Sequence, residues 1–358
     1  MANVNYKNLL KKAFSGDALT IYLVVIIYSV LSYLLYSGQA SRQLTNMLIS
    51  VSCYVVLAVS LNLVVGLLGE LSLGHAGFMS VGLFSGCLLS MWTVNVLPIV
   101  VRLPLSMIFG GIFAAIIGFV VGLPALRLKG DYLAIVTLAC GEIIKNVITN
   151  LEITGGALGL TTNKSETFIY SKPKVLLPYA IVLVLITVIV MMNIKKSKHG
   201  RAIMAIRDNR IAAEATGVNV TYYKLVVFIL AAFFAGAAGV LYGHSFANIK
   251  PAAFNYNMSI EILVIVVLGG MGSIPGSIIA AIALRVLPEM LREFSDYRML
   301  AYSILLIVIM LLNSNSKFTE FKSKCVAWIK KDILSLLKDI ENLFIKKKHS
   351  KEETENEQ

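Results

Sequence analysis

The sequence predicts an all-α polytopic membrane protein with about ten transmembrane segments, some of them short or broken. Of its 358 residues, 57% are hydrophobic and only 15% are charged, whereas soluble domains are near half apolar and a quarter charged. The apolar residues form repeated runs of roughly 17–25, the length that crosses a bilayer core as a helix. No stretch alternates with period two as barrel strands do, so helices are the predicted spanning elements.

The apolar runs predict the spans in chain order. The first run follows Lys7, Lys11 and Lys12 as a signal peptide would, but its length and the later spans favour an uncleaved span, with cleavage near 37–41 as the alternative. Gly and Pro residues at 269–276 break a longer apolar region at 259–287. The continuous runs are 18–36, 44–68, 71–97, 103–126, 132–151, 175–194, 225–246 and 299–313.

The basic residues predict the orientation, because Lys and Arg are enriched in cytoplasmic loops. A cytoplasmic N-terminus (1–17) places the basic loop 195–224 inside. The lysine-rich tail (314–358) is also inside if 259–287 crosses as two short segments. A re-entrant hairpin at 259–287 would also leave the tail on the cytoplasmic side. The hairpin and the two short crossing segments differ in whether Ser273 reaches the cytoplasm. We therefore expect a membrane domain at 18–313 with both termini cytoplasmic.

The tail after residue 313 has its own pattern. Its apolar residues recur at mostly three- and four-residue spacings with lysines between them. This pattern predicts an amphipathic helix on the anionic inner leaflet, which makes membrane lipid a partner. The alternative is a helix docked on another protein.

Glycine is concentrated at two places, 66–78 and 269–276. Interrupted apolar segments in both halves of a chain indicate a transport pathway, because non-helical backbone is tolerated only where it lines protein or water. The alternative is close helix packing through small residues, which we favour for Gly239 and Gly243. The glycines at 82 and 86 and at 118 and 122 have the same four-residue spacing.

The chain lacks the motifs of an enzyme. It has no GxxxxGK[ST] and no HExxH, and its four histidines and four cysteines show no metal-ligand spacing. No metal site or cofactor is predicted. The net charge is +12, and its basic residues lie between and after the spans. This distribution indicates the orientation of the chain in the membrane and not a nucleic-acid partner.

Intramembrane ionisable groups are functional by default. Glu142 and Lys145 are three residues apart and share one helix face, where they either serve the pathway or form a structural pair. Glu261, Arg285 and Glu289 are placed near segment ends. The sequence places no other ionisable residue at the middle of a span. A proton-coupled carrier usually has several, so this reading is disfavoured.

The loop 195–224 is predicted to contact the source of energy. It holds seven Lys and Arg residues and two acids, and residues 200–217 suggest a short surface helix bounded by glycines. Because the chain cannot bind a nucleotide through a P-loop, energy must enter from another chain, and a docked helix is a common recognition mode. The alternative is a basic loop that only sets topology.

Four motifs resemble those of branched-chain amino acid ABC importer permeases of the LivM-type. They cover roughly 44–312 and are GRAIMAIRDN (200–209) with IAAEATG (211–217), SLNLVVG (60–66) with LSLGHAGF (71–78), LRLKGDYLAIVTL (126–138) with GEI (141–143) and TGG (154–156), and SIE (259–261) through LGGMGS (268–273). General ABC permeases carry E-A-A-x-x-x-G in this loop. Here Ile211 replaces the Glu, so docking cannot depend on that carboxylate.

The resemblance implies a transport subunit in a prokaryotic plasma membrane. A second, related permease subunit would complete the pore, two ATPase subunits would hold the ATP, and an extracytoplasmic binding protein would deliver Leu, Ile or Val. Import of urea, amides or nucleosides by a related permease, or a stand-alone ion-coupled carrier, stay as alternatives. The expected ATPase-coupling residues are Arg201, Arg207, Asp208, Arg210, Ala212, Ala213, Glu214 and Gly217. The expected pathway residues are Asn62, Gly66, Ser72, Gly74, His75, Phe78, Thr137, Glu142, Gly269 and Gly270.

Overall fold

Long helices dominate the computed structural model, which describes residues 42–128, 130–161 and 173–290, with 300, 303, 304, 307 and 311 as single positions. Six helices in these ranges are long and apolar enough to cross a membrane. This confirms the predicted helical membrane architecture. The helices are α3 (Arg42–Asn62) with its π-helical extension η1 (Leu63–Leu68), α4 (His75–Trp92), α5 (Ile99–Ala125), α6 (Asp131–Asn150), α7 (Pro173–Lys196) and α10 (Val220–His244).

Several predictions fall outside the described residues. These are the first span at 18–36, the cytoplasmic segment 1–17 and the amphipathic tail at 314–358. The last predicted span, 299–313, is described only at single positions.

The broken region has the predicted interruption. Helix α11 (Tyr256–Gly269) is followed by α12 (Ile274–Met290). Gly270 and Gly272 between them have φ angles of 90° and 80°, a conformation that costs glycine little because it lacks a Cβ. The backbone of Gly269 contacts that of Gly276 so closely that a Cβ on either residue would collide with the other. The two helices therefore pack directly across the break.

Helices α4, α5 and α10 pack through glycine. A Cβ on Gly82 of α4 would collide with Gly236 of α10, and one on Gly110 of α5 would collide with the Gly82 carbonyl. Gly239 contacts the Met79 backbone in the same way. These contacts confirm the packing interpretation for Gly239. Small residues let helix backbones approach closely where lipid supplies no hydrophobic driving force.

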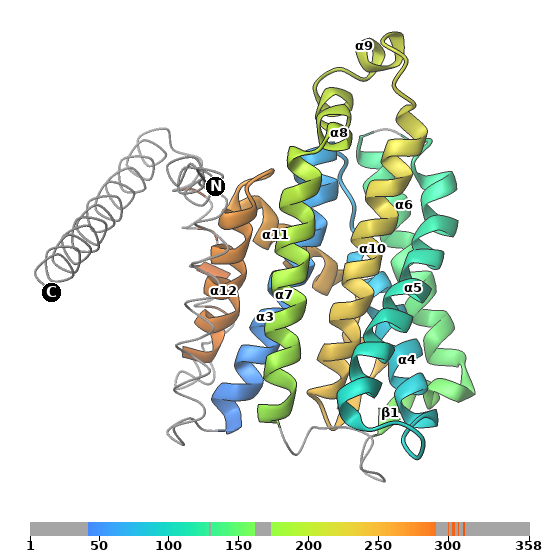
Figure 1. Cartoon of the computed structure of the whole chain (residues 1–358), viewed down its shortest axis with the longest axis vertical. Coiled ribbons are helices and arrows are strands. Elements are labelled where there is room, and N and C mark those ends of the chain that lie inside the picture. The colour runs from blue at the N-terminus through green and yellow to red at the C-terminus, as the bar shows by residue number, and fades with distance from the viewer. Residues whose placement is uncertain are drawn as a thin grey trace, which may run out of the picture. The chain divides into compact units, whose positions relative to one another are not determined.

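Short elements connect the helices at the end of the bundle where α4 and α10 end (Figure 1). Strand β1 (Leu160–Thr161) pairs antiparallel with β2 (Asn248–Ile249), with Leu160 opposite Ile249. The short helices η2 (Glu152–Thr154), η3 (Gly156–Leu158) and η5 (Pro251–Ala253) flank this pair in the sequence.

The basic loop at the opposite end contains two helices, α8 (Lys198–Asp208) and α9 (Arg210–Ala215) (Figure 1). The expectation of one helix bounded by glycines is wrong in this respect. Asn209 is extended, with φ −155° and ψ 103°, and its side chain caps α9 by accepting from the Ala212 N–H at 3.1 Å. Asn is a preferred residue at such caps. Gly200 lies inside α8, and only Gly217 follows a helix end.

Candidate functional site

The two glycine-rich breaks meet, although they lie about 200 residues apart in sequence. The Asn62 Oδ1 atom accepts a hydrogen bond from the Gly272 N–H at 2.7 Å. The Asn62 Nδ2 group donates to the Ser277 Oγ at 2.8 Å and to the Ser273 carbonyl at 3.1 Å. Gly66 lies beside this contact, and a Cβ there would collide with the Gly272 backbone nitrogen.

A π-helical turn at the end of α3 presents a carbonyl to the basic loop. In η1 the hydrogen bonds are wider than in an α-helix, a geometry often found at functional sites. The Glu70 N–H donates to the Val64 carbonyl at 3.2 Å, six residues back. The Gly66 carbonyl accepts from the Arg207 Nη1 at 3.1 Å. Gly69, with φ 78°, ends the turn and contacts the Arg207 side chain.

The second break is held from the same loop. The Lys195 Nζ donates to the Gly272 carbonyl at 2.7 Å. Thus Arg207 of α8 contacts one break and Lys195, at the end of α7, contacts the other. Cations suit these positions because carbonyls outside regular helix hydrogen bonding carry partial negative charge. Together these contacts define a junction, the residues Asn62, Gly66, Lys195, Arg207 and Gly272.

A buried ion pair lies next to the junction. Lys224, at the start of α10, pairs with Glu70, which follows the π-helical turn. Their side chains are only 3% and 15% exposed. A buried charge without its partner is strongly destabilising, so neither residue can be lost alone without a cost.

The charged residues among the predicted coupling residues, apart from Arg201, form two ion pairs, one at the end of α8 and one within α9. Arg207 pairs with Asp208 at 2.9 Å while also bonding Gly66, and Arg210 pairs with Glu214 at 2.9 Å within α9. Ala213 is buried, whereas Ile211 is 79% exposed. The exposed Ile stands where the general signature has Glu, so the outer surface of α9 is apolar there. The remaining coupling residues, Arg201, Ala212 and Gly217, are exposed.

The predicted pathway residues in the first half surround a buried histidine. The His75 Nε2 is 2.9 Å from the Ser60 Oγ, and its ring meets Phe78 edge to face. The Thr137 Oγ1 accepts from the Leu73 N–H at 3.0 Å. Gly74 packs on the Thr137 backbone, and Ser72 is buried. These contacts bring α3, α4 and α6 together, and they give each of these polar groups except Ser72 a protein partner.

Glu142 forms the predicted pair with Lys145, which confirms the spacing argument. Its other oxygen, Oε1, accepts from the Tyr256 N–H at 2.8 Å. Tyr256 is the first residue of α11, and a carboxylate is favourable at a helix N-terminus. Glu142 therefore holds the start of α11 against α6. Its role in transport stays a prediction.

Glu261 and Arg285, which the sequence places near segment ends, pair with each other. Glu261 is the sixth residue of α11, and Arg285 lies five residues before Met290, the last residue of α12. The Arg285 Nη1 is 3.2 Å from the Glu261 Oε1, and the Arg285 Nη2 donates to the Ser50 Oγ at 2.9 Å. The guanidinium lies 3.9 Å from the centre of the Tyr54 ring. Ser50 and Tyr54 are within α3, so the pair lies against the side of a spanning helix. Sequence spacing could not show this, because the two charges belong to different helices.

The bundle, its interrupted helices and its basic surface helices define a multi-pass membrane transport subunit. A family model described as "Branched-chain amino acid transport system / permease component" matches residues 43–313. The chain therefore belongs to this permease family, which confirms the resemblance in the sequence. Subunits of this family are transport components that carry no cofactor.

Individual relatives agree with the family assignment. The chain is 36% identical to the high-affinity branched-chain amino acid transport system permease protein LivM of Escherichia coli over 72% of its length, and 35% identical to LivM of Salmonella typhimurium over the same share. These matches span 66% of each relative, slightly less than two thirds. The LivH permease protein of Salmonella typhimurium is 30% identical over 33% of this chain and 39% of its own length. No solved structure matches the chain.

Proposed function

We propose that this chain forms half of the transmembrane pathway of an ATP-driven importer for branched-chain amino acids. The relatives named LivM support the substrate class, because they are described as branched-chain amino acid permeases. The chain lacks a P-loop, so the energy would come from ATPase subunits. Two of these would contact the segment 195–224 on the cytoplasmic side of a prokaryotic plasma membrane, and both termini would lie on that side.

The observation that carries this proposal is the contact of Arg207 with the Gly66 carbonyl. It joins the exposed helix α8 to the π-helical turn of the most buried span. Lys195 makes a parallel contact with Gly272. A displacement of α8 by a docked ATPase would therefore act directly on the first break through Arg207. The hydrogen bond between Asn62 and Gly272 would connect that movement to the second break. Such a junction can switch a pore if the nucleotide state of the partner favours one arrangement.

Further partners follow from the same proposal. A second, related permease would complete the pore, and relatives named LivM and LivH both resemble this chain. An extracytoplasmic binding protein would deliver the amino acid to the end of the bundle that contains β1 and β2. The buried cluster around His75 and Thr137 and the second break at Gly269 and Gly270 would lie beside the pathway.

Co-purification tests the ATPase contact. We expect the triple variant Arg207→Ala, Asp208→Ala, Arg210→Ala to insert normally and to lose the ATPase subunits. The control variant Glu152→Ala, Lys250→Ala changes exposed residues at the other end of the bundle and should retain them. Full retention by the triple variant would exclude this segment as the docking element. Uptake by the isolated chain in liposomes, driven by an ion gradient, would exclude the ATP-driven mechanism.

A further inference from the structure

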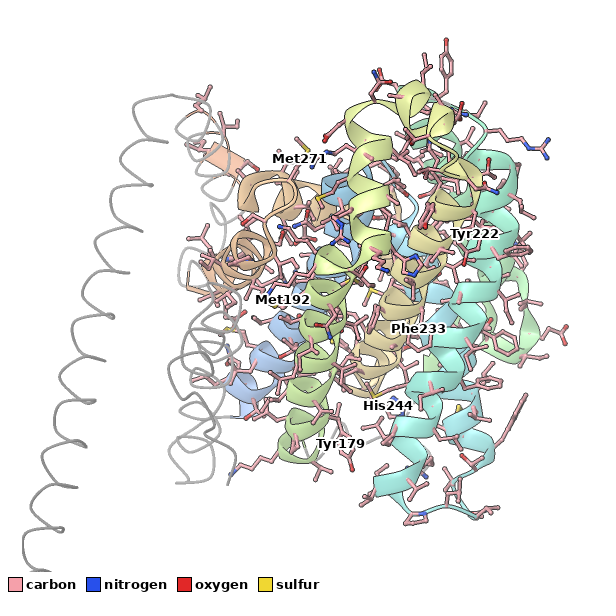
Figure 2. All side chains as sticks on the ribbon, turned by 45° about the horizontal axis from the view of Figure 1, so that its top comes forward. Tyr179, Met192, Tyr222, Phe233, His244 and Met271 are labelled. Atoms are coloured by element: carbon pink, nitrogen blue, oxygen red, sulfur yellow. The ribbon has the colours of Figure 1, made fainter. Side chains whose placement is uncertain are left out.

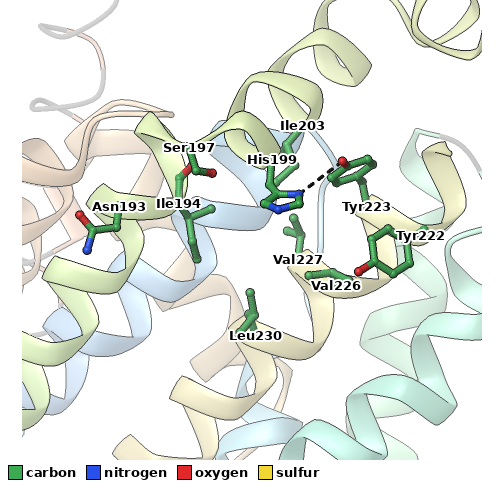
Figure 3. A pocket seen from close by; sticks show the side chains of 10 residues that line it. All are labelled: Asn193, Ile194, Ser197, His199, Ile203, Tyr222, Tyr223, Val226, Val227 and Leu230. Atoms are coloured by element: carbon green, nitrogen blue, oxygen red, sulfur yellow. Dashed lines mark hydrogen bonds between the residues drawn. The ribbon is translucent and has the colours of Figure 1, made fainter. Parts of the chain in front are cut away.

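Two cavities lie along the seam between α7 and α10. The first has a volume of about 350 Å³ and opens beneath α8 (Figure 3). Half of its ten lining residues are aliphatic: Ile194 from α7, Ile203 from α8, and Val226, Val227 and Leu230 from α10. The second has a volume of about 240 Å³ and lies deeper between α5, α7 and α10.

One face of α10 lines both cavities. It contributes Tyr222, Tyr223, Val226, Val227 and Leu230 to the first and Phe233, Phe234 and Ala237 to the second. The spacing of three and four residues keeps them on one side of the helix. Figure 2 shows Tyr222 towards the α8 end, Phe233 further along and Tyr179 of α7 beyond it. From 222 to 237 the helix rises about 22 Å, which exceeds the roughly 15 Å half-thickness of a bilayer core. The seam is therefore long enough for an acyl chain.

The mouth of the seam is polar. His199 and Tyr223 face each other there, with the His199 Nδ1 3.4 Å from the Tyr223 Oη. Tyr222 is exposed beside them, and aromatic residues of this kind are enriched where a span meets the headgroups. Ser197 caps α8 by accepting from the Gly200 N–H at 3.1 Å, so the N-terminus of α8, which favours anions, begins at this mouth.

Charge identifies the ligand class. Ser197 and His199 of the mouth belong to a basic stretch of sequence that also holds Lys196, Lys198 and Arg201, and residues 195–207 include no acid. Lys195, in the same stretch, is already bonded to the Gly272 carbonyl. Lys224, the next basic residue on α10, is already paired with Glu70. Basic pockets between spans on the cytoplasmic side suit anionic headgroups. A polar mouth in a basic stretch of the chain, above an aliphatic and aromatic seam, matches the headgroup and the acyl chain of a phospholipid.

We propose that this seam binds an anionic phospholipid of the inner leaflet, with its phosphate at Lys196, Lys198 and His199 and one acyl chain along α10. The assignment of this end to the inner leaflet rests on the orientation in the proposed function. The lipid would contact α7, α8 and α10 together. Because α8 also carries Arg207, the lipid would be connected to the junction through that helix. It would thus be a structural ligand of the junction and not a transported substrate.

Native mass spectrometry of the full complex, purified in detergent and titrated with phosphatidylglycerol or phosphatidylcholine, tests the headgroup. We expect tighter binding of phosphatidylglycerol. Because each lysine near a membrane anion contributes about fivefold in affinity, Lys196→Gln with Lys198→Gln should weaken it about 25-fold. The matched control, Lys174→Gln with Lys250→Gln at the other end of the bundle, should leave it unchanged. Equal binding of both lipids, or an unaffected double variant, overturns the proposal.

A second variant tests the acyl chain. Leu230→Trp fills the first cavity, so phosphatidylglycerol binding should fall at least tenfold. Ile116→Trp, on the exposed apolar face of α5, is the control and should bind as the wild type does. Retained lipid in the Leu230→Trp complex, or crosslinking from position 230 to another protein chain instead of lipid, overturns the site. ATPase co-purification is recorded in the same samples, so that failure of the proposed function is separately visible.

Discussion

Asn62 and Gly272 are joined across 210 residues of sequence by a single hydrogen bond of 2.7 Å. Through its other side-chain atom, Asn62 also reaches Ser273 and Ser277. The Asn62 side chain therefore gives a partner to the Gly272 N–H, which lies in the interruption between α11 and α12 and outside their helical hydrogen bonding. Such groups must find partners in a membrane, where water cannot supply them. Asn62 is thus a structural connection between the two breaks.

Replacing Asn62 with Ala should destabilise the chain. It leaves the Gly272 N–H without its acceptor, which we expect to lower the free energy of unfolding by about 1–3 kcal/mol. The Ser273 carbonyl keeps the Ser277 N–H as a donor. The measurement is thermal unfolding in detergent. Asn150→Ala is the control, because Asn150 is exposed and bonds only the Asn146 carbonyl in its own helix. Equal effects of the two substitutions would contradict the assigned role.

Gly66→Ala should be poorly tolerated. The added methyl group would collide with the Gly272 backbone, and overpacking of this kind costs about 1–3 kcal/mol. The expected result is a lower yield of folded protein and a lower unfolding temperature. At Gly141 a Cβ would meet its nearest neighbour, the Gly74 Cα, at 3.6 Å, an ordinary contact. Gly141→Ala should therefore behave as the wild type does, and a similar loss at both positions would argue against the contact.

The Glu70 and Lys224 pair should show strong energetic coupling. Lys224→Met leaves a mostly buried carboxylate unpaired, so we expect a loss of about 3–5 kcal/mol in stability. Combining it with Glu70→Gln should restore a large part of that loss. A double-mutant cycle measures the coupling. The exposed pair of Arg210 and Glu214 serves as the reference, with an expected coupling of about 0.3–0.5 kcal/mol. Additive effects at Glu70 and Lys224 would show that the pair contributes no specific interaction.

Glu142 can be tested by comparing two substitutions. Glu142→Gln keeps an oxygen that can accept from the Tyr256 N–H. The leucine uptake expected from the proposed function should therefore stay within about threefold of the wild type. Glu142→Ala removes that acceptor, and stability should fall by about 1–2 kcal/mol. Uptake in proteoliposomes and unfolding in detergent are measured on the same preparations. Uptake abolished by Glu142→Gln at unchanged stability would instead place the carboxylate in the transport pathway.

Much of this fold is predictable because hydropathy is a local property. The run at 132–151 corresponds to α6 (Asp131–Asn150), and the break at 269–276 includes the gap between α11 and α12. A span needs about 20 apolar residues whatever its neighbours are. Glycine and proline likewise interrupt a helix through their own geometry. These features need no knowledge of tertiary contacts.

The junction was not predictable, because each of its contacts joins distant segments. Arg207 was expected at a partner surface, but the structure also turns it to the Gly66 carbonyl. Lys195 and Gly272 carried no specific role, and neither did the Glu70 and Lys224 pair. Asn209 contained a usable signal, since Asn favours helix caps and could have indicated two helices in the loop. The Arg285 and Glu261 pair contained none, because its members lie on different helices.

The glycine contacts among α4, α5 and α10 have a mechanical consequence. The helix backbones touch at these glycines with no side chain between them. If one helix slid along another, larger side chains would meet at the contact points and collide. These three helices should therefore behave as a single stiff body. If the chain alternates between outward- and inward-facing states as proposed, the movement would occur where other elements contact these three helices. These places are the junction at Asn62 and Arg207 and the seam between α7 and α10. In the proposed transport cycle, α4, α5 and α10 would stay fixed relative to one another, and the residues of the junction would move against them.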